Sequence, residues 1–434
     1  MTNFEITKIK SRWILDSRGN PTVETDVFAG NIYARAAVPS GASTGILEAL
    51  ELRDGGKAFM GNHVTKAVSN VNNIISKELI NFDVREQENI DNKMIALDGT
   101  ENKGKLGANA ILSVSLANAK LAAKLLDKPL FQYLYEVSYG KSSNKFLLPL
   151  PCCNILNGGK HAGNNLAIQE FMILPIGARS FSLAIQNVAE VYHTLKNILS
   201  KKYGKPAVNV GDEGGFAPDL SNTRDALDVI LEAVEEAGFL EGTDFVIGID
   251  AAASEFYKDE LYHIDGKKLI EEDLLQYYID LIHDYPLKSI EDPFDEKAFN
   301  GFSNLNAKIG SNIQIVCDDI TVTNINILKK VISEKAGNAL LLKVNQIGSL
   351  TESINAAKLA FENDFNVMVS HRSGETEDTF IADLSVGLCS GQIKSGAVAR
   401  SDRNAKYNQL LRIEEILEDN ADYPSTFDYW RKFQ

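Results

Sequence analysis

The pattern of apolar and polar positions divides the chain near residue 140. Before that point, β-rich runs over 22–28 and 32–39 flank Ala29-Gly30-Asn31 and predict a hairpin. Apolar residues with helical spacing then predict helices over 64–80, 84–97 and 109–126. The polar run 138–145, rich in Ser and Gly, is typical of a linker. We therefore expect an α+β domain over residues 1–140 and a second domain over residues 141–434.

Beyond residue 140 the pattern becomes regular. Short apolar runs of strand length end in a charged or polar residue, and each is followed by a loop and a helical pattern. The residues that end these runs are Glu213, Asp250, Glu291, Asp318, Lys343, His371 and Lys394. The number of residues between successive run ends is that of one strand plus one return helix. The alternation predicts βα units that form a parallel sheet.

Two architectures share this alternation. A (β/α)8 barrel carries functional groups at the carboxyl ends of its strands, whereas a doubly wound open sheet gathers its ligand at one switch point. The barrel is favoured because functional residues end nearly every run. The predicted fold class is α/β, with a C-terminal (β/α)8-type barrel and an N-terminal α+β cap domain.

Charge and composition exclude several classes of protein. The 44 Lys and Arg against 59 Asp and Glu leave a net charge of -15, which argues against a nucleic-acid or anionic-membrane partner. The longest apolar stretches fall far short of the roughly 20 residues of a membrane span. Charged residues interrupt the amino terminus, so no secretory signal is predicted and a cytoplasmic location is expected. Four cysteines in 434 residues do not make a disulfide framework.

Three carboxylates, Asp250, Glu291 and Asp318, end successive strand-like runs. On a closed barrel they would point into one mouth, where two carboxylates about 5 Å apart repel by roughly 3 kcal/mol. Such a group needs a cation, and an oxygen-only ligand set favours Mg2+ over zinc. The alternative is that each acid caps the next helix or lies solvated in a loop.

Two further residues are candidates for proton transfer. Lys343 lies in the run 340–344, which is too apolar for a surface lysine. Either it reaches solvent or an ion pair, or it is a working amine whose pKa is lowered by desolvation and a nearby metal. Glu213 lies among Gly211, Gly214 and Gly215, which allow close approach of a ligand; the alternative is an acidic turn.

Cations and a hydroxyl are expected on the same rim. His371, Arg372 and Ser373 are consecutive, and Lys394 ends the next run. An Arg fork beside a Ser hydroxyl suits a phosphate or carboxylate oxygen. Together with a metal and an amine base, this set suits proton abstraction beside a carboxylate. Two glycine-containing loops, 40–45 with Ser43 and 157–163 with His161, are able to fold over a ligand.

Ordered motifs along nearly the whole chain resemble the enolase family. They include DSRGNPTVE from Asp16, VPSGASTG, NGGKHAGN, VGDEGGFAP, IEDPFDE, LLKVNQIGSLTE and SHRSGETED. The resemblance implies an α+β cap and an atypical barrel with one antiparallel strand among its first strands, which the run 167–174 fits. It also implies a lyase that converts 2-phosphoglycerate to phosphoenolpyruvate and water. Enolase-superfamily sites are a known example of a Lys or His base used with one or two Mg2+ ions.

The resemblance also assigns roles to residues. Lys343 would be the base and Glu213 the acid, with Glu170 supporting the acid side and His371 among the catalytic residues. Asp250, Glu291 and Asp318 would hold the tighter Mg2+, and Ser43 would reach a second one. The expected substrate contacts are Gln169, His161, Glu170, Glu291, Asp318, Lys343, Arg372, Ser373 and Lys394.

The family is usually a homodimer and sometimes an octamer. Arg12, Glu24, Arg412 and Glu415 match positions that pair across its dimer contact, so a dimer is expected. Two other functions are alternatives. One is a relative acting on another carboxylate substrate, against which the phosphate-type clamp argues. The other is a binding role, as a silent paralogue or in an additional cell-surface or secreted pool, against which the intact catalytic set argues only in part.

Overall fold

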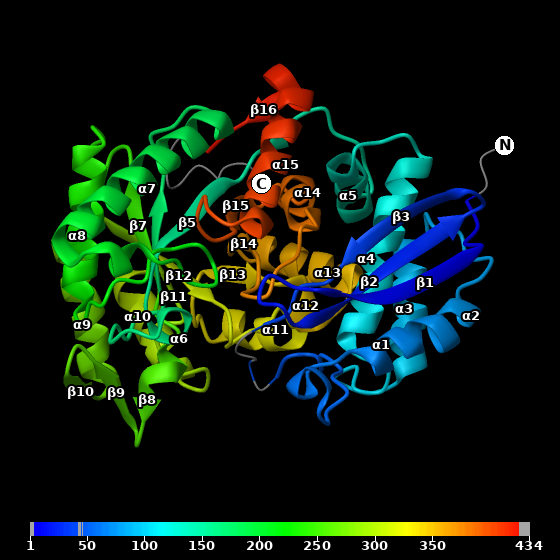
Figure 1. Ribbon diagram of the computed structural model, residues 1–434, viewed down its shortest axis with the longest axis horizontal. Helices are drawn as coiled ribbons and strands as arrows, with labels where there is room; N and C mark the ends of the chain where they lie inside the picture. Colours follow the sequence, from blue (N-terminus) through cyan, green and yellow to red (C-terminus); the bar gives the residue numbers. More distant parts are fainter. Residues whose placement is uncertain (1–3, 42–44, 46, 425–434) are drawn as a thin grey trace.

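The computed structural model describes residues 4–41, 45 and 47–424. Its first part is a three-stranded antiparallel sheet of β1 (Lys8–Leu15), β2 (Pro21–Ala29) and β3 (Ile32–Ala37), in that order. The predicted hairpin corresponds to β2 and β3. The sequence pattern did not reveal β1, which pairs with β2 along its whole length. Figure 1 shows this sheet and its helices beside the larger second part.

Helices pack on one side of the cap sheet. The apolar α4 (Ala108–Leu125) is buried over nearly its whole length and contacts β2 and β3. The segment predicted as one helix over 64–80 is helical but contains a π turn, η2 (Val71–Ile75). The helices of this part are η1 (Ala58–Gly61), α1 (Thr65–Asn70), α2 (Ser76–Glu78), α3 (Gln87–Asp98), α4 (Ala108–Leu125) and α5 (Leu130–Tyr139). The boundary predicted near residue 140 follows α5 and remains a prediction.

The second part is a closed eight-stranded barrel, as predicted. Its strands follow one another around the barrel in chain order. They are β5 (Leu150–Asn157), β6 (Glu170–Leu174), β7 (Val246–Asp250), β11 (Leu287–Glu291), β12 (Gln314–Cys317), β13 (Ala339–Leu342), β14 (Asn366–Ser370) and β15 (Gly391–Lys394). Apart from the half-buried Lys288 on β11, the residues of these strands are buried, which fits near-continuous apolar strands covered by helices.

One barrel strand runs against the others. β6 pairs antiparallel with both β5 and β7, and Glu170 lies opposite Asp250 in the register. The antiparallel strand expected within 167–174 is thereby confirmed. Because β6 is reversed, Glu170 at its amino end lies on the same rim as the carboxyl ends of β7 and β11.

The run that ends at Glu213 is not a barrel strand, so that prediction was wrong. Residues Lys205–Val208 form the 3-10 helix η3, and Val210 makes only an isolated bridge with Phe216. Pro206 lacks an N–H for a strand ladder, and glycines follow closely. Glu213 instead lies in a turn above the barrel, and β5 and β6 supply the first two strands.

Helices surround the barrel (Figure 1). Ser180, Asn222, Asn324 and Ser349 each accept a backbone N–H at the start of a helix, which satisfies an otherwise unpaired donor. The longer helices are α7 (Phe181–Tyr203), α8 (Thr223–Glu236), α9 (Glu271–Asp284), α10 (Phe299–Ile309), α11 (Ile325–Ser333), α13 (Leu350–Phe361), α14 (Phe380–Gly387) and α15 (Ser401–Leu417). Shorter elements are β4 (Phe146–Leu147), α6 (Gly159–Ala162), η4 (Ala253–Phe256), β8 (Tyr257–Lys258), β9 (Leu261–Ile264), β10 (Lys267–Leu269), α12 (Val344–Ile347), η5 (Glu418–Asn420) and β16 (Ala421–Asp422).

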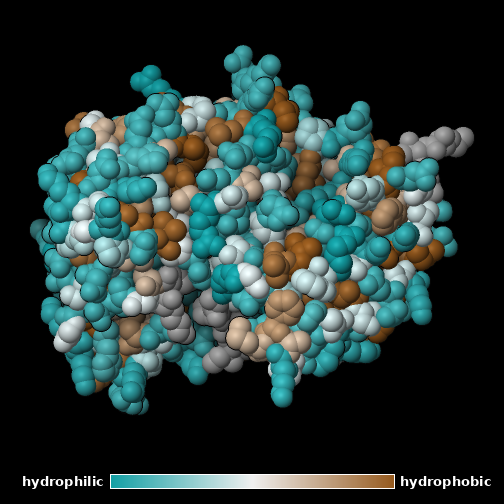
Figure 2. Space-filling view, viewed as in Figure 1, coloured by the Kyte–Doolittle hydropathy of each residue, from teal (hydrophilic) through white to brown (hydrophobic). Residues whose placement is uncertain are grey.

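The surface agrees with the acidic composition. Figure 2 shows hydrophilic residues over most of the visible face, with scattered apolar patches between them. Among the helices of the described residues, none is long and apolar enough to cross a membrane. The four cysteines are free thiols, three of them buried.

Candidate active site

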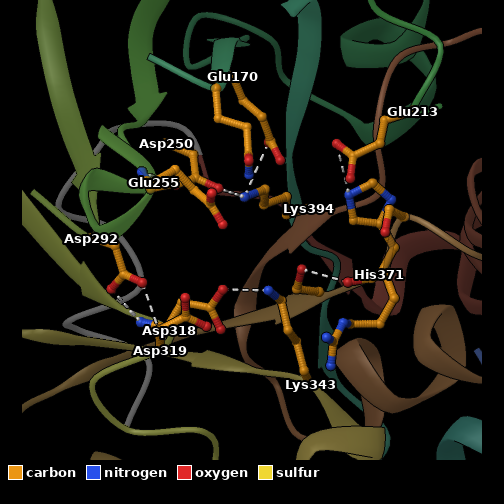
Figure 3. Close-up of a pocket in the computed structure, with 15 residues that line it drawn as sticks. Glu170, Glu213, Asp250, Glu255, Asp292, Asp318, Asp319, Lys343, His371 and Lys394 are labelled. Carbon is orange, nitrogen blue, oxygen red and sulfur yellow. Dashed lines mark hydrogen bonds and ion pairs between the residues drawn. The ribbon is translucent and has the colours of Figure 1, made fainter. Parts of the chain in front are cut away.

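A buried lysine lies among the carboxylates at the mouth of the barrel. Lys394 Nζ is 2.9 Å from Asp250 Oδ2, 2.8 Å from Glu291 Oε2 and 3.1 Å from Glu170 Oε2. Figure 3 shows its amine pointing between Glu170 and Asp250. Burial alone would lower the pKa of Lys394, but the carboxylates around it, Asp250 first, raise it well above the ordinary value. Lys394 is therefore charged and holds the acidic strand ends together.

The predicted metal ligands adjoin one another on this rim. Asp250 and Glu291 are register partners on β7 and β11, and Asp318 follows β12 directly. Burial and the charge of Asp250 raise the pKa of Glu291 well above its usual range. Glu291 Oε1 is buried and accepts no hydrogen bond from the described residues. An oxygen-only donor set with a spare buried oxygen fits a hard divalent cation.

A second acidic group overlaps this set. Within the described part of the chain, Asp292, Asp318 and Asp319 each bring a ligand atom within 4.8 Å of the others. However, the Asp292 carboxylate accepts the backbone N–H groups of Asp318 and Asp319 at 2.9 and 2.8 Å. Asp292 therefore shapes the loop that carries Asp318, and both it and Asp319 escaped the sequence prediction.

Lys343 lies beside Asp318, on the side of the acidic group away from Lys394 (Figure 3). Its amine forms an ion pair with Asp318, whose other oxygen accepts a hydrogen bond from Gln346 Nε2 at 2.8 Å. Burial alone would lower the pKa of Lys343, but Asp318 outweighs burial and raises it above the ordinary value. This direction is opposite to the one predicted, because the nearest carboxylate pairs with the amine itself.

The acid side gathers three titratable groups. Glu213 Oε2 accepts a hydrogen bond from Asn154 Nδ2 at 3.0 Å and lies 3.5 Å from His371 Nε2. Burial, and after it the nearby Glu213, raises the pKa of Glu170 well above its usual range. Burial lowers the pKa of His371 well below 6.5, which keeps its imidazole neutral. Gln169, next to Glu170, lines the same pocket.

The anion clamp is joined to the cap domain. Arg372 Nη1 and Nη2 donate to the two carboxylate oxygens of Glu48 at 3.0 and 3.2 Å, and Nη1 also donates to Asn345 Oδ1. Ser373 lines the pocket beside it. An anion that binds Arg372 would compete with Glu48, a residue that the sequence pattern did not single out.

Two predicted residues cannot be placed. Ser43 lies outside the described residues. His161 belongs to α6, whose backbone follows β5, but its side chain is outside what the structure describes. The pocket also contains Glu255, which sequence reasoning missed because it lies in the short helix η4 rather than at a strand end.

Buried amines, carboxylates and an imidazole face one another in this mouth, an arrangement typical of an acid–base enzyme built on a capped barrel. Residues 6–134 match the family described as "Enolase, N-terminal domain", and residues 145–429 match "Enolase, C-terminal TIM barrel domain". The chain belongs to the enolase family and is a lyase, a phosphopyruvate hydratase.

Curated relatives agree with this assignment over nearly the whole chain. The enolase of Methanocaldococcus jannaschii is 58% identical over 95% of this chain and 96% of that protein. The enolases of Thermococcus gammatolerans and Pyrococcus furiosus are each 56% identical over 97% of both chains.

Proposed function

We propose that the protein catalyses the reversible, Mg2+-dependent dehydration of 2-phosphoglycerate to phosphoenolpyruvate at the mouth of the barrel. The observation that carries the proposal is the arrangement of Lys343 and the Glu170–Glu213 pair on opposite sides of one acidic pocket (Figure 3). A base and an acid on opposite sides suit removal of a proton from one carbon and of a hydroxyl from the next.

Asp250, Glu291 and Asp318 would hold the tighter Mg2+, and Ser43 a second one. When bound, the ions supply positive charge that stabilises the carboxylate of the substrate and of the enolate intermediate. The buried, unbonded oxygen of Glu291 supports this assignment. Lys394, already charged among these residues, would add a fixed cation to the same region.

Each side chain then has a distinct task. Lys343 would take the α-proton on Nζ, which requires that its amine first lose its own proton and leave Asp318. Glu213 would donate a proton to the departing β-hydroxyl, and Glu170 beside it would support this acid. Arg372 and Ser373 bind phosphate oxygens, and Gln169 and His161 contact the substrate.

Replacing Lys343 tests the base. Lys343→Ala is expected to lower kcat by at least about 10²- to 10⁴-fold, the usual contribution of a general base. Binding of Mg2+, followed by titration calorimetry, is expected to persist. Lys330→Ala, which removes an exposed lysine of α11, is the matched control and is expected to keep normal turnover. Near-normal rates in Lys343→Ala would reject Lys343 as the base.

We further propose that the protein acts as a homodimer in the cytoplasm. Arg412 and Glu415 on α15 are exposed and so accessible to a second protomer. Arg12 forms ion pairs with Glu24 and Asp26 of its own chain. A second protomer would therefore meet charges that are already paired within the first.

A further inference from the structure

Arg403, in the first turn of α15, is the largest fully buried side chain of the described residues. Burying a guanidinium is costly unless its five N–H donors are engaged. Nη1 donates to the Arg372 carbonyl at 2.6 Å, and Nη2 donates to the carbonyls of Ser373 and Asp212 at 2.7 and 3.1 Å. Nε contacts Asp402 Oδ2 at 2.8 Å.

These carbonyls belong to two separate segments of the candidate site. Arg372 and Ser373 follow β14 and carry the anion clamp, whereas Asp212 precedes the acid Glu213. One planar guanidinium therefore sets the separation between the clamp and the acid. A lysine, with a single nitrogen, could not reach both segments with the same geometry.

The remaining contact of Arg403 determines which ring nitrogen of a neighbouring histidine carries the proton. Its Nη1 also approaches Nδ1 of His371 within hydrogen-bond distance. A guanidinium only donates, so Nδ1 must offer its lone pair and cannot carry a proton. The ring proton of a neutral His371 then lies on Nε2, the nitrogen that is 3.5 Å from Glu213 Oε2.

We propose that Arg403 is a positioning residue that holds His371 as the neutral Nε2–H tautomer and so directs one N–H toward Glu213. That N–H would stabilise the Glu213 carboxylate after it gives up its proton. The catalytic consequence rests on the proposed function, while the tautomer itself does not. Charged groups that face His371 are Glu213, Arg403, Lys394 and Lys343, and burial with these cations opposes a second ring proton.

The tautomer is read directly by nitrogen NMR of the Mg2+-loaded protein carrying 15N-histidine, without substrate. The chain has six histidines, and the His371 signals are assigned by their loss in His371→Gln. We expect one protonated and one unprotonated ring nitrogen at neutral pH, with the proton on Nε2. A proton on Nδ1, or an imidazolium, would overturn the proposal whatever the enzyme turns over.

Variants separate positioning from stability. In Arg403→Met we expect a second tautomer or an imidazolium at His371, and a loss in kcat of about 10- to 100-fold with KM changed far less. Arg403→Lys keeps a donor for Nδ1. Unlike Arg403→Met, it is expected to retain the single His371 tautomer and part of the wild-type kcat. Unchanged tautomer and kcat in a folded Arg403→Met would contradict the proposal.

Lys406→Met is the matched control. Lys406 is also a fully buried cation of α15, and it donates to Glu375 Oε2 and to the Thr376 carbonyl rather than to His371. Its loss is expected to destabilise the protein and leave the His371 tautomer unchanged. A tautomer change in Lys406→Met equal to that in Arg403→Met would assign the effect to general loosening and overturn the positioning role. If Arg403→Met does not fold, the wild-type and Arg403→Lys spectra decide.

Discussion

Asp383 is a buried carboxylate remote from the barrel mouth. It lies in α14 and accepts a hydrogen bond from Gln409 Nε2 at 3.1 Å. Burial raises its pKa to about 7, so the folded protein keeps this proton while the unfolded chain loses it near pH 4. The folded state therefore loses stability as pH rises from about 4 to 7, and the full penalty persists above pH 7.

Asp383→Asn should remove that pH dependence. Relative to wild type, we expect its gain in the free energy of unfolding to grow by about 2 kcal/mol between pH 5.5 and 8.5. Urea midpoints at the two pH values measure the change, and Asp280→Asn, at an exposed site of α9, serves as the control. An equal gain at both pH values would show that Asp383 is ionised in the folded protein.

Single residues differ in how far the sequence reveals them. Asp250, Glu291 and Lys394 could be placed on one rim because each ends an apolar strand. The contacts between these side chains could not be predicted from the sequence. Which side chain reaches which neighbour depends on how the barrel closes. Arg403 was hidden for another reason, since a charged residue in a helix ordinarily indicates a solvated face.

At the scale of elements, α4 joins the cap to the barrel through one ion pair. Lys120 Nζ lies 2.7 Å from Asp378, which also accepts the backbone N–H of Ala37 at 2.9 Å. Burial would raise the pKa of Asp378, but Lys120 outweighs it and the pKa is lowered. The carboxylate is therefore charged and depends on its lysine.

Lys120→Met would leave this carboxylate buried without its cation. We expect a loss of about 3 kcal/mol in the free energy of unfolding, at the low end for broken buried pairs because Lys120 is partly exposed. Lys124→Met, one turn along α4 and exposed, is expected to change stability by less than about 0.5 kcal/mol. Equal losses in the two variants would refute a specific role for the pair.

The same scale shows where pattern reasoning failed. Residues 207–213 have the apolar composition of a strand, but Pro206 and the following glycines prevent a ladder, and the chain turns. The reversal of β6 followed from the family resemblance and not from its local sequence, since the alternating pattern of a strand carries no direction. Without that reversal, Glu170 would lie at the far end of the barrel.

For the whole molecule, the proposed dimer predicts a mass about twice 47.7 kDa by light scattering at micromolar concentration. Arg412→Glu, which reverses an exposed charge on α15, is expected to shift the protein toward the monomer, more so at low salt, because exposed charges are less screened there. A wild-type mass of one chain at these concentrations would reject the dimer.

The central claim is that this barrel mouth dehydrates 2-phosphoglycerate with Mg2+. The most direct test follows the ultraviolet absorbance of the new double bond when purified protein is mixed with 2-phosphoglycerate and Mg2+, with EDTA in a parallel sample. We predict steady turnover with Mg2+, its loss in EDTA and its return when Mg2+ is restored in excess. Folded protein that shows no turnover with Mg2+, or equal turnover in EDTA, would contradict the claim.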